Sequence, residues 1–198
     1  IATLRFDFFG QGDSDGPFEA ITVTTAAAQA DAALAWGCAE GYREIGLMGS
    51  SFGGLVAILV GARTPTLHGL ALKCPVADFP EVLRLEFGPE GMAEWQRTNT
   101  IPNVTGGEGR VRLDYGFYED CLRHSGHDAA ARIACPTLIV HGDRDELVPL
   151  RQSQRLRDVL TGPAHLEVIE GADHGFSKAE HFHRMTGLIA DWMTAHLE

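Results

Sequence analysis

Short apolar runs bounded by glycine or proline recur along the chain, and we interpret each of them as a buried β-strand. Such runs are typical of parallel strands, which are covered on both faces and lack the polar–apolar alternation of half-exposed sheets. The expected strands cover residues 2–8, 45–48, 69–72, 137–141 and 166–169.

Apolar residues at helical spacing lie between these runs. One expected helix, which Gly41 would end, carries Val23, Ala27, Ala30, Leu34 and Cys38 on one face. A second carries Phe182, Met185, Ile189, Trp192 and Met193. Because strands and helices alternate, we predict right-handed crossovers and an α/β fold: a mostly parallel sheet with helices on both faces.

One stretch, residues 76–132, interrupts this alternation, and we interpret it as a cap-like insertion over the sheet edge within a single domain of residues 1–198. It contains a polar, glycine-rich piece at residues 98–110, with a glycosylation-type triplet at Asn103 to which we give no weight. Its aromatic side chains either line an acyl or aryl pocket or form a core of their own, and a core suits most of them better. They include Phe79, Phe87, Trp95, Tyr115, Phe117 and Tyr118.

The charge of the chain narrows the class of partner. Lys and Arg number 16 against 27 Asp and Glu, and a net charge of −11 would repel nucleic acid but suits a small neutral or hydrophobic substrate. No apolar run approaches the roughly 20 residues that cross a bilayer, so we expect no membrane span. The four cysteines form no C-x-x-C pair, which favours buried free thiols over a zinc site or a disulfide framework.

Candidate chemistry begins at Gly49-Ser50-Ser51-Phe52-Gly53, which matches G-x-S-x-G. An expected strand precedes it and an apolar helical run, residues 55–62, follows, as a nucleophilic serine on a sharp strand-to-helix turn requires. We expect side chains at either outer glycine to clash with the neighbouring strand and helix. The N–H of Phe52, at the helix N-terminus, would face a developing oxyanion. Without partners for Ser51, the turn has a purely structural interpretation as well.

Partners for Ser51 lie in two loops downstream. A serine hydroxyl needs a base to remove its proton, and the base needs a third group to orient it. Asp143 and Asp145 follow the fourth expected strand, and His174 follows the fifth. Parallel strands bring these loops to one sheet edge, in the chain order serine, acid, histidine of G-x-S-x-G hydrolases. We interpret Asp173 as a loop acid and His141 as a packing or turn residue.

Four segments together resemble the α/β-hydrolase superfamily: residues 6–16 (FDFFGQGDSDG), 49–54 (GSSFGG), 141–145 (HGDRD) and 171–174 (GADH). They follow the order of the family along nearly the whole chain. Within the superfamily, the sequence is most similar to bacterial cinnamoyl (feruloyl) esterases and related carboxylesterases. This resemblance implies that the triad acid is Asp145, at the fifth place of H-G-x-x-D, and that Asp143 is a turn residue.

The resemblance also implies strands ahead of residue 6 and an H-G-F-like loop that supplies a second oxyanion-hole donor. The chain begins at Ile1, too late to contain either, so we expect a truncated enzyme that lacks this donor. Loss of one such donor typically costs about 2.7–4 kcal/mol in the transition state. We expect a cytoplasmic protein, with the reservation that a signal peptide would have preceded Ile1.

These observations predict a serine esterase that acts on small-molecule carboxylic esters through an acyl-enzyme, with Ser51 as nucleophile, His174 as base and acid, and Asp145 orienting His174. A thioesterase or an aminoacyl-peptidase with the same triad is the alternative, as is a non-catalytic ligand-binding relative. We expect no cofactor and no metal site. The spacings of His124 with His127 and of His181 with His183 would suit a metal, but no carboxylate or cysteine constellation accompanies them.

Overall fold

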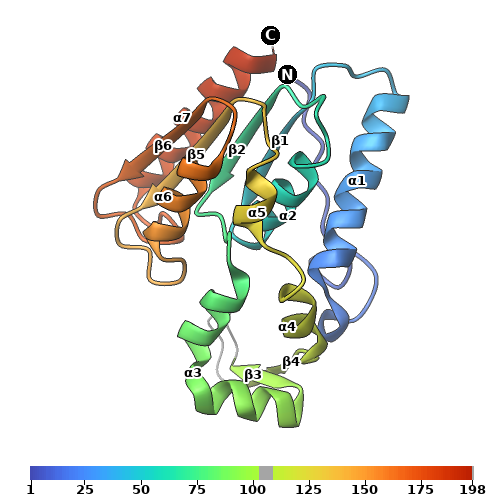
Figure 1. Cartoon of the computed structure of the whole chain (residues 1–198), viewed down its shortest axis with the longest axis vertical. Helices are drawn as coiled ribbons and strands as arrows, with labels where there is room; N and C mark the ends of the chain where they lie inside the picture. The colour runs from blue at the N-terminus through green and yellow to red at the C-terminus, as the bar shows by residue number, and fades with distance from the viewer. Residues whose placement is uncertain (103–108, 198) are drawn as a thin grey trace.

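The centre of the computed structural model, which describes residues 1–102 and 109–197, is a four-stranded parallel sheet in the order β1-β2-β5-β6 (Figure 1). Its strands are β1 (Gly46–Ser50), β2 (Gly69–Lys73), β5 (Thr137–Gly142) and β6 (Ala164–Ile169). Four of the five expected strands are thus confirmed, together with the parallel α/β architecture. In the register, the last residue of β1, Ser50, pairs with the last residue of β2, Lys73.

The strand expected at residues 2–8 is wrong. Residues 1–7 are exposed and belong to no element, and no strand within the described ranges lies beside them. Leu4 keeps 56% and Phe6 42% of its surface in contact with solvent. A strand forms only where a neighbour accepts and donates its backbone hydrogen bonds. The apolar pattern indicates a tendency to be buried, but it does not supply that neighbour.

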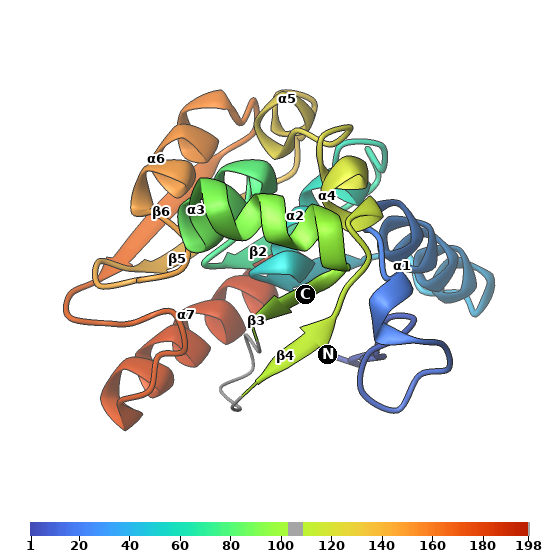
Figure 2. The same ribbon diagram turned by 90° about the horizontal axis from the view of Figure 1, so that it is seen from below.

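Helices cover both faces of the sheet (Figure 2). Ile139 of β5 packs with α2 (Phe52–Gly61) and α6 (Leu150–Val159) on one face. Leu138 and Val140 of the same strand pack with α7 (Ala179–Leu197) on the other face. α1 (Val23–Ala39) lies on α2, after a short 3-10 helix at Phe18–Ala20. None of the described helices has the length and apolar character that a membrane crossing requires.

Both helices predicted from spacing are confirmed. The first ends where expected: Gly41 has a φ of 95°, and the next residue, Tyr42, donates its N–H to the carbonyl oxygen of Gly37 at 3.1 Å. This pair of features is the Schellman ending, for which glycine is favoured because it accepts a positive φ. On α7 the predicted face is right at Met185, which is buried, but wrong at Phe182, which is 49% exposed. Phe182 lies in the first turn of α7 and is not part of the cluster in which Met185 packs with β5.

Between β2 and β5 the chain forms α3 (Phe79–Thr98), β3 (Thr100–Pro102), β4 (Arg110–Arg112) and α4 (Gly116–Cys121), and these elements lie together beyond the carboxyl ends of the strands (Figures 1 and 2). α3 breaks at Gly88, which has a φ of 61° and precedes Pro89. α5 (Gly126–Ala130) returns to pack against α2 and α6. The limits of the insertion, 76 and 132, stay a prediction, and the triplet at Asn103 lies outside the described residues.

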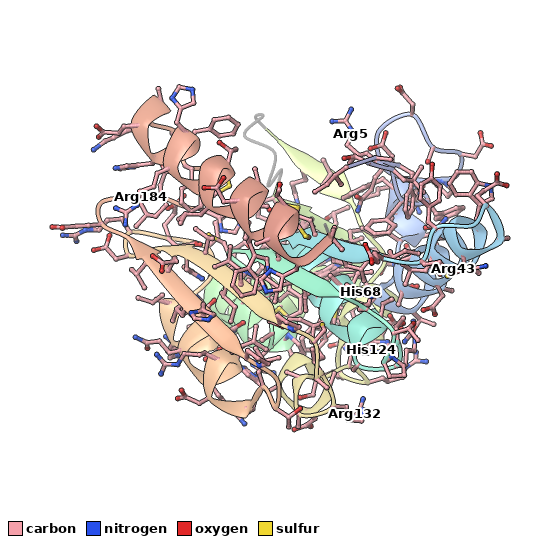
Figure 3. The ribbon with its side chains drawn as sticks, turned by 90° about the horizontal axis from the view of Figure 1, so that it is seen from above. Arg5, Arg43, His68, His124, Arg132 and Arg184 are labelled. Carbon is pink, nitrogen blue, oxygen red and sulfur yellow. The ribbon has the colours of Figure 1, made fainter. Side chains whose placement is uncertain are left out.

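Cationic side chains are spread over several elements. Figure 3 labels Arg5, Arg43, Arg132 and Arg184 together with His68 and His124, which come from different parts of the chain. His124 and Arg132 line one pocket with Arg63 and Arg123. The exclusion of a nucleic-acid partner stays a prediction.

Candidate active site

The carboxyl ends of the four parallel strands form the edge at which the predicted catalytic residues meet. Ser51 directly follows β1, Asp145 follows β5 and His174 follows β6. β2 ends between β1 and β5, so its last residue, Lys73, lies within the same row. The sheet therefore gathers residues that are up to 123 positions apart in the chain.

Ser51 occupies a strained turn between β1 and α2. Its φ is 51° and its ψ is −116°, a conformation that costs a side-chain-bearing residue about 1–3 kcal/mol. Its N–H donates to the carbonyl oxygen of Lys73 at 3.0 Å, and its carbonyl oxygen accepts from Gly54 at 3.0 Å and from Val76 at 3.2 Å. Within the described residues, its hydroxyl makes no hydrogen bond that caps the helix. The backbone is held while the hydroxyl stays free.

The glycines around Ser51 differ in whether a side chain would fit at their positions. A Cβ at Gly49 would lie 2.3 Å from the carbonyl oxygen of Gly53, so the expected clash is confirmed there. The same expectation is wrong for Gly53, where an added Cβ meets nothing within 4 Å. The constraint lies one residue later instead, because a Cβ at Gly54 would come within 2.8 Å of Pro75. Gly53 lies on the open side of the first helical turn, whereas Gly54 faces the chain that leaves β2.

Phe52, predicted to supply an oxyanion-hole N–H, is the first residue of α2. The first N–H groups of a helix have no carbonyl partner in the preceding turn and point out along the helix axis. The N–H of Phe52 is therefore available beside the Ser51 hydroxyl, although its role in catalysis stays a prediction.

The aspartate and histidine are joined by a short hydrogen bond. His174 Nδ1 lies 2.8 Å from Asp145 Oδ2. The Asp145 side chain is 1% exposed and that of His174 is 13% exposed. With Nδ1–H donated to the carboxylate, Nε2 carries the free lone pair that a base requires. The structure thus places the pair in the arrangement that orients a catalytic imidazole.

The Asp145 carboxylate also accepts hydrogen bonds from the backbone. Its Oδ1 accepts from the N–H groups of Leu147 at 2.9 Å and Val148 at 2.8 Å. Burial by itself would raise the pKa of Asp145, but the hydrogen bonds from His141, His174 and the backbone outweigh burial and hold the pKa far below its ordinary range. The carboxylate stays ionised and able to stabilise a positive charge that forms on His174.

His141 was missed by the prediction, which made it a packing or turn residue. It is fully buried, its Nδ1 lies 2.7 Å from Ser153 Oγ, and its Nε2 lies 3.0 Å from the carbonyl oxygen of Val148 and 3.2 Å from Asp145 Oδ2. Because the Val148 carbonyl can only accept, Nε2 carries the proton and Nδ1 accepts from the serine hydroxyl. His141 therefore holds the Asp145 carboxylate through its Nε2–H. The sequence signal for this contact was the position of His141 as the first residue of H-G-x-x-D.

The neighbouring aspartates hold the loops. Asp143 Oδ1 accepts from the N–H of Gly171 at 2.6 Å and so joins the loop after β5 to the loop after β6. Asp173 Oδ1 accepts from the N–H of Ser177 at 2.9 Å, which fits its interpretation as a loop acid. Neither oxygen is directed at the His174 ring in these contacts.

Cys74, His141 and Asp145 bring three atoms of metal-ligand type within 4.8 Å of one another. Burial raises the pKa of the Cys74 thiol to about 12, and both ring nitrogens of His141 take part in hydrogen bonds. Metal ligands must be deprotonated and free to bind, so this set is poorly suited to an ion. The histidines at 124 and 127 are likewise engaged separately, with Thr24 and with the carbonyl oxygen of Gln152. The absence of a metal site stays a prediction.

Aromatic rings from the cap segment reach the residue beside the nucleophile. The ring of Phe52 lies 6.0 Å from that of Phe79 and 6.1 Å from that of Phe117. Phe117 and Trp95 are buried in one core cluster of this segment, whereas Phe52 and Phe79 are only partly buried. Most of these rings therefore form a core, and Phe52 and Phe79 form its margin towards Ser51.

Comparisons with known proteins agree with this architecture. Residues 26–198 match the profile of the prolyl oligopeptidase family. In sequence, the chain is similar to a Mus musculus protein named palmitoyl-protein thioesterase ABHD10, mitochondrial, with 28% identity over 96% of this chain and 64% of the relative. The chain thus spans about two thirds of the length of this curated relative. The predicted cytoplasmic location stays a prediction.

Two solved structures show the same fold. Est1E from Butyrivibrio proteoclasticus, determined with bound ferulic acid, superposes with a TM-score of 0.76 at 23% identity, covering 95% of this chain and 76% of that one. Alpha/beta hydrolase domain-containing protein 10 from mouse superposes with a TM-score of 0.78 at 22% identity, covering 96% and 77%. The predicted α/β-hydrolase fold is confirmed.

Proposed function

Because the chain belongs to the prolyl oligopeptidase family, we propose that it is a serine hydrolase that cleaves carboxylic esters through an acyl-enzyme intermediate. The observation that carries this proposal is the 2.8 Å hydrogen bond between Asp145 and His174 at the sheet edge where Ser51 sits on its strained turn. A buried, ionised carboxylate that holds one tautomer of a partly exposed imidazole leaves Nε2 free to take a proton, as a catalytic base requires.

In the proposed reaction, the same side chains act first in acylation of Ser51 and then in hydrolysis of the acyl-enzyme. His174 Nε2 takes the proton of the Ser51 hydroxyl as its oxygen attacks the acyl carbon, and Asp145 stabilises the imidazolium. The N–H of Phe52 donates to the oxyanion. His174 then gives the proton to the leaving alcohol, and water, activated by the same imidazole, releases the acid and restores Ser51.

Thioesters and aminoacyl peptides are the second class of substrate, because the triad does not choose the leaving group. A relative named as a palmitoyl-protein thioesterase favours a thioester, and the family to which the chain belongs is named for oligopeptide substrates. A panel of matched oxygen esters, thioesters and aminoacyl amides that share one acyl group would rank these classes by kcat/KM. The preferred leaving group is the one for which kcat/KM is highest.

The chain offers a matched control for the nucleophile, because Ser50 and Ser51 are adjacent. Replacement of Ser51 by alanine is expected to abolish hydrolysis of p-nitrophenyl acetate, with a loss in kcat on the order of 10⁶-fold if the triad acts as a unit. Ser50→Ala should retain activity. A fluorophosphonate probe should label the unaltered protein and Ser50→Ala but not Ser51→Ala. An active Ser51→Ala enzyme would show that the nucleophile is wrong, and a folded, unlabelled and inactive parent chain would favour a ligand-binding role.

A further inference from the structure

Lys73, the last residue of β2, contacts both sides of the proposed site. Its carbonyl oxygen accepts the N–H of Ser51 at 3.0 Å, and its ammonium donates to the carbonyl oxygen of His174 at 2.7 Å. Nζ also lies 5.4 Å from the centre of the Phe176 ring. One residue therefore joins the backbone of the nucleophile to the backbone of the base.

The topology explains why the histidine needs such an anchor. His174 follows β6, and Ser51 follows β1 at the opposite edge of the sheet. Three strand spacings separate these strands, or about 14 Å, so the loop after β6 must fold back across the sheet to bring its imidazole to the serine. β2 lies directly beside β1, and the Lys73 side chain meets the loop there.

Other contacts of this loop hold its far side. Asp143 accepts from Gly171, and the N–H of Arg144 donates to the carbonyl oxygen of Ala172 at 3.0 Å. Asp143 and Arg144 both follow β5, and their partners Gly171 and Ala172 precede His174 by three and two positions. At His174 itself, Asp145 holds the ring and Lys73 binds the backbone carbonyl oxygen. Phe176 is buried and has a φ of 53°, so the backbone here is strained as well as folded back.

The composition sets Lys73 apart from an ordinary surface lysine. The chain has only two lysines among its 16 cationic Lys and Arg residues. Lys178 is exposed, whereas Lys73 is half-buried among the groups of the site. A half-buried ammonium loses part of its hydration and needs acceptors to compensate, and here the acceptors are a carbonyl oxygen and an aromatic face.

We propose that Lys73 is a positioning residue for hydrolysis: its bond to the carbonyl oxygen of His174 fixes the distance between the imidazole and the Ser51 hydroxyl. This inference rests on the proposed serine-hydrolase function. Displacement of a reacting group by about 1 Å costs about 100-fold in rate. Lys73 contacts the backbone of His174 and not the reacting atoms, so its loss lowers kcat while KM changes little.

The test compares Lys73→Met, which keeps the apolar stem without the donor, with Lys73→Arg, which restores a cationic donor. Lys178→Met is the matched control on the same loop. We expect Lys73→Met to lower kcat for p-nitrophenyl acetate by about 10- to 100-fold, with fluorophosphonate labelling of Ser51 slowed in parallel. The arginine variant should recover part of kcat, and Lys178→Met should equal the parent protein.

Two further measurements separate positioning from stability. The thermal midpoint of Lys73→Met should stay close to that of the parent, and the proton resonance of His174 Nδ1–H should move or broaden because the ring is less well held. Unchanged kcat would overturn the inference. A loss of activity that is explained entirely by a loss of folded protein would also overturn it. So would failure of both Lys73→Met and Lys73→Gln to fold. Each of these outcomes would mean that Lys73 serves the fold alone.

The parent protein distinguishes failure of this inference from failure of the proposed function. A parent chain that is labelled at Ser51 and hydrolyses the ester, beside a Lys73→Met variant of equal kcat, contradicts the role of Lys73 only. A folded parent chain that is neither labelled nor active contradicts both proposals.

Discussion

Two regions that meet beside Ser51 are built by opposite means. Around Asp145, the contacts are directional hydrogen bonds: His141, His174 and Val148 each donate to one carboxylate. Around Trp95, the partners are rings and aliphatic side chains that pack by shape. Among the described residues, its side chain makes one hydrogen bond, from the indole N–H to the carbonyl oxygen of Leu113 at 2.6 Å. A carboxylate tolerates no isostere without loss of charge, whereas a ring cluster tolerates repacking if its volume is kept.

Because their contacts differ in kind, we expect the two regions to have different roles. On the proposed function, the hydrogen-bonded edge would determine whether a bond is cleaved, because proton transfer demands fixed distances and directions. On the same proposal, the aromatic cluster would support the surface that an acyl group approaches, because apolar contacts are individually weak and adaptable. We therefore expect substitutions at the edge to lower kcat more than they lower stability, and substitutions in the cluster to do the reverse.

The largest contrast is expected at Asp145. Asp145→Asn keeps the shape of the side chain but removes its charge and the tautomer control of His174, so kcat should fall by about 10⁴-fold. Asp143→Asn is the matched control, since an amide oxygen can still accept the N–H of Gly171. Ester hydrolysis under single-turnover conditions measures both. Equal losses in the two variants would mean that the loops, and not the triad acid, limit the rate.

Truncation of Trp95 tests the cluster. Trp95 is fully buried, and Trp95→Ala should lower the free energy of unfolding by about 3–5 kcal/mol through the cavity it leaves. Leu85, on the same helix and 59% exposed, provides the control: Leu85→Ala should change stability by less than about 0.5 kcal/mol. Urea unfolding followed by circular dichroism gives both values. A Trp95→Ala protein of parental stability would contradict the assignment of this segment to a packed core.

A smaller effect is expected from pH. The folded pKa of Asp145 lies below its ordinary value of 3.8, so the carboxylate stabilises the fold above that value and this contribution fades as pH falls further. The stability advantage of the parent protein over Asp145→Asn should therefore be constant near neutrality and shrink below about pH 4. Urea unfolding at several pH values checks this. A difference that does not vary between pH 7 and pH 3 would show that Asp145 is not held ionised by its partners.

The sequence predicted the placement of Ser51, Asp145 and His174 because that placement follows from strand order. Each residue comes just after an apolar run, and parallel strands put such positions on one edge. The contacts of His141 and Lys73 were not predicted, because no local sequence pattern specifies them. The Lys73 ammonium meets a carbonyl oxygen 101 residues away.

Errors elsewhere have a common physical origin. Residues 2–8 have the apolar pattern of a strand but pair with no strand among the described residues, and Gly53 sits in a motif whose spacing constrains Gly49 more than Gly53. In both cases the pattern describes a residue's preference, while the outcome depends on what lies opposite it in space. The aromatic residues of the cap segment show the same limit, since sequence could not divide Trp95, in the core, from Phe79, at its margin.

The order of the strands across the sheet, β1-β2-β5-β6, is also their order along the chain. All of the chain from α3 to α4 lies between two adjacent strands, β2 and β5. On the proposed function, catalysis and substrate selectivity would then be separable modules, because neither junction carries the proposed nucleophile, acid or base. Exchange of that segment for one of another length leaves the row of strand ends intact. The segment is therefore the natural unit for transplantation, in evolution or in the laboratory, when a new acyl group is to be accepted by an unchanged edge.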